Sequence, residues 1–201
     1  MTTKTEKLPK HKTCKACKHK FTPTQPLAYV CGWQCAITYA NALAEKRKAL
    51  EASQSRRETK LKLDKLKTKS EWLKDAQVAM NRYVRARDYG KRCISCQTLL
   101  TTNGSTGGAY DCGHWRSTGS APHLRFYILQ MAGQCKKCNR YLSGNAVEME
   151  RGLIDRLGKE KVEDIKADQR PRKYQIEQLE RIKKIFNRRA KWYESRLNIN
   201  N

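Results

Sequence analysis

Apolar positions recur with a helical spacing through much of the chain. From about Ala36 to Tyr89 there is no proline, and Ala, Leu, Lys, Glu and Arg dominate, which favours helix. The apolar stripe fades between residues 51 and 60, so this stretch forms either two helices or one long exposed helix. Thr68 and Glu71 have the spacing of a capping box that would begin a second helix.

The second of these helices is expected to bury one apolar face and to end at Gly90. That face consists of Leu73, Ala76, Met80, Tyr83 and Val84. Two further helices are predicted, one from a capping box at Asn145 and Glu148 to Gly158, the other from about Arg172 to Leu197. The stripe of the last helix, which serves core packing or dimerisation, consists of Ile176, Leu179, Ile182, Phe186, Tyr193 and Leu197.

The composition limits the core and indicates a kind of partner. Hydrophobic residues make up 38% of the 201 residues and charged residues 31%, which predicts a modest core with solvated helices. A formal net charge of +24 indicates a polyanion, because cationic side chains release counterions from phosphates. DNA, RNA, the ribosome and a membrane surface all fit the charge alone. No apolar run could span a bilayer and no secretory signal begins the chain, so we expect a cytoplasmic protein.

Eight of the nine cysteines fall into two groups of four. In a reducing compartment, such spacing indicates metal binding rather than disulfides. The first group, with the spacing of a small zinc finger, is Cys14, Cys17, Cys31 and Cys35. The second group, two knuckles that can supply four thiolates to one tetrahedral zinc, is Cys93, Cys96, Cys135 and Cys138. Both groups are predicted to be structural zinc sites, and Cys112 is predicted to be a free buried thiol.

Residues that could hydrolyse a phosphodiester lie beside the second cysteine group. Such hydrolysis needs a base that deprotonates water and a divalent cation that stabilises the charge on the phosphate. His114 lies between the two knuckles, and Asn139 follows the last cysteine directly. This arrangement looks like a ββα-metal (HNH) nuclease core, in which a histidine at the end of a strand is the base and an Asn is a metal ligand.

A more specific resemblance covers nearly the whole chain. Its motifs are Asp111-Cys-Gly-His114, Ala121-Pro-His123-Leu-Arg125-Phe126, Gln134-Cys135-x-x-Cys138-Asn139-Arg140 and Ser143-Gly144-Asn145. In this order, with the N-terminal cysteines and the basic helix, they resemble the NinG/Rap recombination endonucleases of lambdoid phages. The resemblance implies a nuclease that acts in the host bacterial cytoplasm on Holliday junctions and D-loops.

Two positions depart from the HNH pattern. Gln130 stands where the central Asn is expected, and its longer amide could still hold the loop that carries the catalytic histidine. Gly113 precedes the base, where an Asp metal ligand is common, so Asp111 is the nearest carboxylate. Residues 111 and 114 of a regular strand point to opposite faces. A bulge at Gly113 would be needed to bring both to one metal.

The expected roles follow from these motifs. His114 would be the base, and Asn139, with Asp111, would bind a catalytic Mg²⁺ or Mn²⁺. The structural alternatives are a zinc-linked histidine and a helix N-cap. Four further side chains would bind the substrate phosphates: Arg116, His123, Arg125 and Arg140. Arg116 and Arg125 could instead pair with carboxylates, and His123 could be an ordinary surface histidine.

The fold class expected is mainly α, with a small zinc-stapled ββα-metal (HNH-like) core. The segments are an N-terminal zinc finger with a basic arm over residues 1–36, a basic helical region over 37–90, the nuclease core over 91–145, and C-terminal helices over 146–201. A flexible Gly-rich loop is expected over residues 101–108. The cofactors would be two structural Zn²⁺ and one catalytic divalent cation.

The function expected is a junction-nicking endonuclease of phage recombination. A homodimer would set two active sites against the symmetric strands of a junction, and recombination proteins of phage or host are further candidate partners. Two alternatives remain open. One is a non-catalytic DNA-binding recombination accessory protein, in which Gln130 and Gly113 mark a decayed site. The other is a zinc protein that binds RNA or the ribosome.

Overall fold

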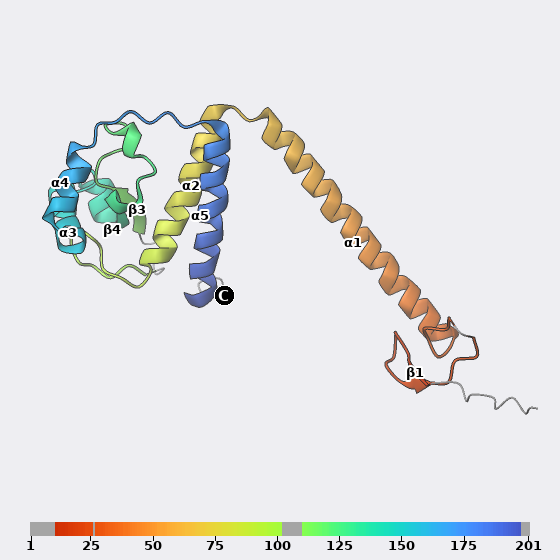
Figure 1. The fold of residues 1–201 in the computed structure, drawn as a ribbon. Helices are drawn as coiled ribbons and strands as arrows, with labels where there is room; N and C mark the ends of the chain where they lie inside the picture. The colour runs from red at the N-terminus through yellow and green to blue at the C-terminus, as the bar shows by residue number, and fades with distance from the viewer. Residues whose placement is uncertain (1–10, 26, 102–109, 198–201) are drawn as a thin grey trace, which may run out of the picture. The chain divides into compact units, whose positions relative to one another are not determined.

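The computed structural model describes residues 11–25, 27–101 and 110–197. The chain divides into two compact units, Met1–Leu66 and Lys67–Asn201 (Figure 1). The boundary falls inside the basic helical region predicted over residues 37–90, so that region contributes to both units. Most of the basic arm predicted at the N-terminus and of the loop predicted over residues 101–108 lies outside the described residues.

The first unit contains a hairpin, a cysteine cluster and one helix. Strands β1 (Lys12–Thr13) and β2 (Lys20–Phe21) pair antiparallel, and Cys35 lies in the first turn of helix α1 (Trp33–Leu66). Cys14 is the only buried residue among residues 11–25 and 27–66. A segment with so little core needs another interaction to close it, and metal binding by its cysteines can supply one.

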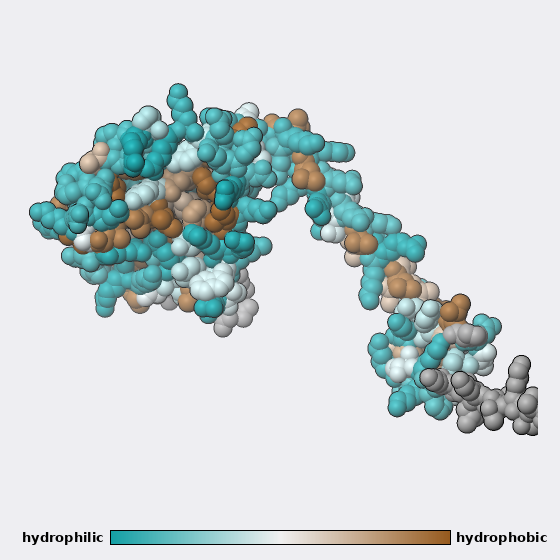
Figure 2. Space-filling view, viewed as in Figure 1, coloured by the Kyte–Doolittle hydropathy of each residue, from teal (hydrophilic) through white to brown (hydrophobic). Residues whose placement is uncertain are grey.

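Helix α1 has no buried residue along its length. Its apolar side chains show as separate spots on a hydrophilic surface, not as one stripe (Figure 2). No helix in the described part of the chain is both long and apolar enough to cross a lipid bilayer. The Ala, Lys, Glu and Arg content of α1 supports a helix by local propensity, so the helix forms without burying a face.

Helix α2 (Lys69–Asp88) opens the second unit with the predicted capping box. The Thr68 hydroxyl accepts a 3.3 Å hydrogen bond from the Glu71 amide, and the Thr68 amide donates to the Glu71 carboxylate at 2.7 Å. These hydrogen bonds from Thr68 hold the pKa of Glu71 below its ordinary value. The long helical stretch is therefore two helices, separated where Thr68 caps the second.

Helix α5 (Ile176–Leu197) packs along α2 and confirms the predicted core role of its stripe (Figure 1). The apolar contacts between the two helices come from Trp72, Ala76, Met80, Tyr83, Val84, Leu179, Phe186, Ala190 and Tyr193. The helix begins later than Arg172, where the sequence pattern put its start. The Arg172 guanidinium pairs with Asp168 at 2.7 Å, and the Gln175 amide donates to the Gln178 side chain at 2.8 Å, as at a helix cap.

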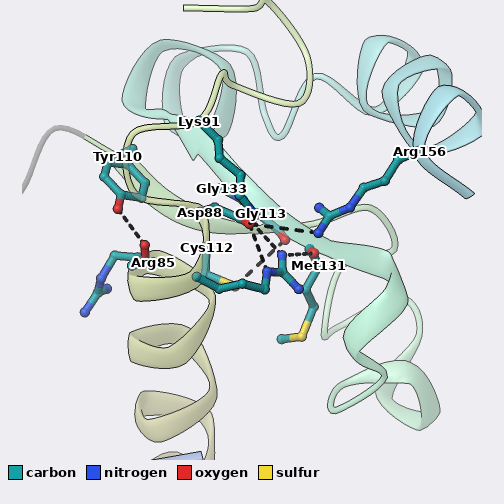
Figure 3. Close-up of polar contacts among 10 residues, drawn as sticks. Arg85, Asp88, Lys91, Tyr110, Cys112, Gly113, Met131, Gly133 and Arg156 are labelled. Atoms are coloured by element: carbon teal, nitrogen blue, oxygen red, sulfur yellow. Dashed lines mark hydrogen bonds and ion pairs between the residues drawn. The ribbon is translucent and has the colours of Figure 1, made fainter. Parts of the chain in front are cut away.

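A two-stranded antiparallel hairpin lies at the centre of the second unit. Its strands are β3 (Tyr110–His114) and β4 (Met131–Cys135), and every residue has one partner across the pairing. The Tyr110 hydroxyl donates a 2.6 Å hydrogen bond to the carbonyl oxygen of Arg85, which links β3 to α2 (Figure 3). The hairpin therefore lies directly against the first helix of its unit.

Short turns connect the hairpin to the remaining helices. Two 3-10 turns, η1 (Pro122–Leu124) and η2 (Ile128–Gln130), lead from β3 to β4. After β4, the expected helix is only a π-helical turn, η3 (Lys137–Tyr141). Helices α3 (Ala146–Leu157) and α4 (Lys159–Ala167) follow and pack around Met149, Leu153, Val162 and Ile165.

The start of α3 differs from the prediction. Asn145 has a left-handed backbone with φ 43° and makes no side-chain cap; its amide nitrogen instead donates to the Cys138 sulfur at 3.7 Å. The capping box predicted at Asn145 and Glu148 is therefore wrong, because Asn145 serves the cysteine cluster and Glu148 pairs with Arg151. The predicted end at Gly158, with φ 86°, is confirmed.

A buried carboxylate joins α2 to the hairpin (Figure 3). Asp88, the last residue of α2, is 3% exposed and accepts hydrogen bonds from the Gly133 amide at 2.8 Å and from Arg87 Nε at 2.9 Å. Arg87 also donates to the carbonyl oxygen of Met131 at 2.9 Å. Burial alone would raise the pKa of Asp88, but the Arg87 charge and the Gly133 amide hold it below its ordinary value.

Replacing Cys14 and Cys17 with serine should remove one of two zinc ions and unfold the β1–β2 hairpin. The first unit has almost no core, so metal binding and folding are coupled there. Elemental analysis should show zinc falling from about two to about one per chain. Hydrogen exchange should show lost protection at the Cys14, Lys15 and Lys18 amides, while the amides of the second unit keep theirs. Unchanged zinc content or unchanged protection would contradict this expectation.

Asp88→Ala should lower the free energy of unfolding by about 3 to 5 kcal/mol, because it leaves the buried Arg87 guanidinium without its partner. Asp164→Ala removes a carboxylate from a surface ion pair with Lys161 and should cost less than about 1 kcal/mol. Chemical denaturation at neutral pH measures both. Equal stability of the two variants would refute the role of Asp88 as an anchor.

The Asp88 contribution should also depend on pH in a defined direction. Its pKa is lowered in the folded protein, so its stabilisation is present above the unfolded value of about 3.9 and disappears as pH falls through the folded value. The stability difference between wild type and Asp88→Asn, measured by denaturation across this range, should therefore shrink in acid. A difference that grows as pH falls would contradict the sign.

Candidate active site

The two Cys-x-x-Cys knuckles have the same backbone turn. In the first, the Cys14 amide donates to the His19 carbonyl oxygen at 2.8 Å and Lys18 donates to the Cys14 carbonyl oxygen at 3.1 Å. In the second, the equivalent bonds are Cys93 to Thr98 at 2.7 Å and Gln97 to Cys93 at 3.0 Å. Lys18 and Gln97 both have φ near +60°, at 63° and 62°. The shared turn places both sulfurs of each knuckle on one side.

The sulfur distances in both groups fit zinc and not disulfides. Sγ atoms lie 3.6 Å apart for Cys17 and Cys31 and 3.5 Å apart for Cys96 and Cys135. Thiolates bound to tetrahedral zinc at about 2.3 Å lie about 3.8 Å from one another, whereas a disulfide bond is about 2.05 Å long. All sulfur atoms of each group lie within 4.8 Å of one another. Each group could therefore hold a structural zinc.

The second cysteine cluster lies at the end of the hairpin where β3 begins and β4 ends. Cys135 ends β4, and its amide donates to the Cys93 sulfur at 3.3 Å. Gln134, buried in the same strand, donates from its amide nitrogen to the Ser95 hydroxyl at 2.8 Å and to the Gly144 carbonyl oxygen at 2.6 Å. Hydrogen bonds thus join the knuckle, the strand and the segment after the cluster.

His114 is the last residue of β3 and faces α2. Its Nε2 lies 3.3 Å from the side-chain nitrogen of Gln77, which also donates to Asn81 at 2.8 Å. Burial lowers the pKa of His114, and hydrogen bonding to the backbone of Arg125 only partly opposes this. The imidazole is therefore neutral at neutral pH, with a nitrogen lone pair that can accept a proton.

Asp111 and Asn139 meet on the other side of the hairpin. The Asn139 amide nitrogen donates to the Asp111 carboxylate at 3.2 Å, and Arg140 holds both carboxylate oxygens at 2.7 and 3.0 Å. The Arg140 guanidinium is the main cause of a lowered pKa at Asp111. Asp111 is therefore an anion that is paired with Arg140 in this structure.

The regular strand pairing separates Asp111 from His114. Gly113 pairs with Ala132 one to one, so the bulge needed to bring Asp111 and His114 to one metal is absent. A Cβ atom at position 113 would lie 2.4 Å from the Gln134 side chain. Glycine stands directly before His114 because Gln134 fills that space, and the two side chains lie on opposite faces of β3.

The Gln130 side chain links two segments of the loop that follows His114. It is fully buried, its amide nitrogen donates to the Leu124 carbonyl oxygen at 2.7 Å, and its amide oxygen accepts from the Arg116 amide at 2.9 Å. The Trp115 amide donates to the Gln130 carbonyl oxygen at 3.1 Å. The position thus holds both ends of the loop behind the histidine.

The other candidate residues are placed around this loop. His123 Nε2 lies 2.7 Å from the Asp168 carbonyl oxygen and therefore donates to it, while Arg125 donates to the Thr118 carbonyl oxygen at 3.4 Å. Arg116 is partly exposed in the same loop, and its backbone amide donates to Gln130. Cys112 is buried as predicted, and burial raises the pKa of its thiol to about 12.

Sequence reasoning missed the side chains that support His114 and the hairpin. Gln77 and Asn81 are four residues apart beside the apolar stripe of α2, a spacing that puts both on one face. Only packing shows that Gln77 meets His114, while Asn81 accepts a hydrogen bond from Gln77. Gln134 had a weaker signal, as a polar residue within the second strand. Asp88 gave only a weak signal: a carboxylate at a helix C-terminus is unfavourable for the helix dipole, but the sequence does not show which amide it would bind.

The comparisons with known proteins place the chain in a family. The family model described as "Bacteriophage Lambda NinG protein" matches residues 6–195. "Protein ninG" of Escherichia phage 933W is 35% identical over 198 residues, covering 91% of this chain and 94% of the relative. That of Escherichia phage lambda is 34% identical over 200 residues, covering 91% and 93%.

A third relative, "Protein ninG" of Salmonella phage P22, is 34% identical over 190 residues, covering 87% of this chain and 89% of the relative. No solved structure matches the chain. The family match covers both cysteine groups, the hairpin and all but the last two residues of helix α5. The chain therefore belongs to the NinG family of lambdoid phages.

Proposed function

We propose that the protein is a divalent-metal-dependent endonuclease that nicks branched DNA during phage recombination, with an HNH-like centre on the β3–β4 hairpin. The observation that supports this most is that one short strand, β3, carries both His114 and Asp111, the latter in contact with Asn139. These side chains are the kinds of groups that phosphodiester hydrolysis requires: an imidazole base and oxygen ligands for a cation.

His114 would take the proton from the attacking water. Its burial keeps the ring neutral, and its backbone contacts fix the ring at the end of β3. The 3.3 Å contact with Gln77 is long for a hydrogen bond, so a water that enters with the substrate can take that position at Nε2. Gln77 would then help to orient the water.

Asp111 and Asn139 would hold the catalytic cation. A carboxylate and a carboxamide oxygen are ligands that Mg²⁺ and Mn²⁺ prefer. The Asn139 amide would have to turn so that its oxygen, not its nitrogen, faces the site. The bound cation would stabilise charge on the phosphate and on the leaving oxygen. The Arg140 side chain, which is 56% exposed, would release Asp111 and bind a DNA phosphate in its place.

Base and cation ligands on opposite faces can still serve one phosphate at the end of β3. In an in-line displacement, the attacking water and the leaving oxygen lie on opposite sides of phosphorus. His114 is the last residue of β3, and Asp111 lies three residues, about 10 Å, before it on the other face, so one phosphate would meet both only if the end of the strand shifts when DNA binds. Arg116 and Arg125, in the loop beyond His114, would hold the phosphate there.

The positive charge supports DNA as the substrate. A net charge of +24 gives affinity through phosphates without base readout, so selectivity for junctions would come from shape. A homodimer with two hairpins would match the two strands of a junction. Recombination proteins of phage or host are further proposed partners.

One observation favours a second function, a non-catalytic DNA-binding accessory protein. Arg140 already neutralises both oxygens of Asp111, and the regular pairing leaves His114 on the other face. If that ion pair persists when DNA binds, no carboxylate is available for a cation. Such a protein would bind junctions tightly and leave them uncut.

His114→Ala should reduce junction nicking about a hundredfold to ten-thousandfold while leaving junction affinity nearly unchanged, because the ring supplies proton transfer and not binding. The assay incubates zinc-loaded protein with a labelled four-way junction and Mg²⁺ or Mn²⁺. His19→Ala is the matched control, since only the backbone of His19 is used in its knuckle. Tight binding by wild type without nicks would favour the accessory protein instead.

The pH dependence of nicking should report the lowered pKa of His114. A base must be unprotonated, so the rate should rise with pH and level off, with the midpoint of the rise below the ordinary histidine value of about 6.5. Single-turnover nicking across mildly acidic to neutral pH measures this midpoint. A midpoint well above that value would exclude His114, in this environment, as the base.

A further inference from the structure

The C-terminal half of α5 forms a pocket with α2 that the proposed chemistry does not use. The pocket has a volume of about 330 Å³. We call it the aromatic–arginine pocket, and it is lined by Tyr83, Arg188, Arg189, Trp192 and Tyr193. Its size lies within the range of small-ligand sites in proteins.

Aromatic rings lead from the core to the surface along this pocket. Tyr83 is buried, and its ring centroid lies 5.9 Å from that of Tyr193. Tyr193 contacts Trp192 edge to face, with centroids 4.8 Å apart. Trp192 is 49% exposed although two helices pack beside it. A base can stack on this half-exposed indole by taking the place of the Arg196 guanidinium, which lies 3.8 Å from the ring centre and would then be free to bind phosphate.

The charges around the rings are positive and lack acidic partners. The Arg196 guanidinium carbon lies 3.8 Å from the centre of the Trp192 ring, and Arg189 stacks on Phe186 at 5.4 Å. The nearby carboxylate of Glu194 is buried and is held by Arg82 at 2.7 Å. Within the described residues, no ion pair joins Arg188, Arg189 or Arg196 to a carboxylate. The pocket therefore suits a ligand that is both flat and anionic.

We propose that the aromatic–arginine pocket binds an unpaired nucleotide, with the base stacked on the aromatic rings and the phosphates held by the arginines. Bases within a duplex are covered on both faces by their neighbours, whereas a branch point or a single strand exposes them. The pocket would thus recognise unpaired DNA at a branch. The inference rests on the proposed DNA substrate and does not depend on cleavage.

The test compares the affinities of the full-length zinc-loaded protein for an oligothymidine strand and for a blunt duplex of equal length, at one salt concentration. Trp192→Ala should weaken binding to the strand at least about fivefold, because stacking on one aromatic ring contributes that much per base. Duplex affinity should stay within about twofold, because phosphate contacts remain. Trp192→Phe should restore most of the strand affinity.

Trp33→Ala is the matched control, since Trp33 is 71% exposed but belongs to the first unit. It should leave the ratio of strand to duplex affinity at the wild-type value. An unchanged ratio in Trp192→Ala overturns the pocket. If Trp192→Ala changes the oligomeric state but not the strand-to-duplex ratio, nucleotide binding in the pocket is also overturned. The aromatic–arginine pocket would then be a contact with a second copy of the chain.

The two proposals fail in different ways. Wild-type protein that binds neither strand, duplex nor junction overturns the proposed DNA substrate and the pocket together. Wild-type protein that binds junctions, with a strand-to-duplex ratio insensitive to Trp192, overturns the pocket alone. In a thermal scan, Trp192→Ala should unfold only slightly below wild type, because it loses the edge-to-face contact with Tyr193 but leaves the buried core residues in place.

Discussion

The buried carboxylate of Asp88 is the contact on which the placement of the hairpin depends. It accepts the Gly133 amide of β4, and its partner Arg87 donates to Met131, so the end of α2 holds both ends of one strand segment. A Cβ atom at position 133 would lie 2.6 Å from Leu100, which shows how closely this strand approaches α2 and the knuckle loop. With β4 fixed in this way, β3 and its terminal His114 lie against the middle of α2, where Gln77 meets the imidazole.

Two buried glutamines complete what the short strands cannot hold alone. Gln134 links the knuckle to the segment after the cysteine cluster, and Gln130 links the two ends of the loop behind His114. A two-stranded hairpin is marginal by itself in water. The cysteine cluster, the Asp88 anchor and these carboxamides together hold it in place against α2.

Local signals in the sequence predicted much of the fold. Thr68 and Glu71 begin a helix as their spacing requires, Gly158 ends one, and the two cysteine groups come together as tetrads. Asn145 failed because its backbone is left-handed and its amide serves a cysteine, a tertiary demand that overrides the capping pattern. Helix α4 and the contact of Gln77 with His114 depend on packing between distant segments, for which neither periodicity nor spacing carries a signal.

The candidate site was predicted only in part, because it too depends on how distant segments pack. The motifs predicted that Asp111 and Asn139 would meet. They left open whether a bulge would bring His114 to the same face, and the regular strand pairing shows that it does not. The central claim is that these two faces form one centre around a cation. Mn²⁺ titrated into zinc-loaded protein tests it directly by nuclear magnetic resonance, because paramagnetic broadening reports proximity. The account predicts that the Asn139 side-chain amide and the His114 ring lose signal together at the lowest Mn²⁺ additions. Broadening that leaves His114 untouched, or that lies away from the hairpin, would contradict it.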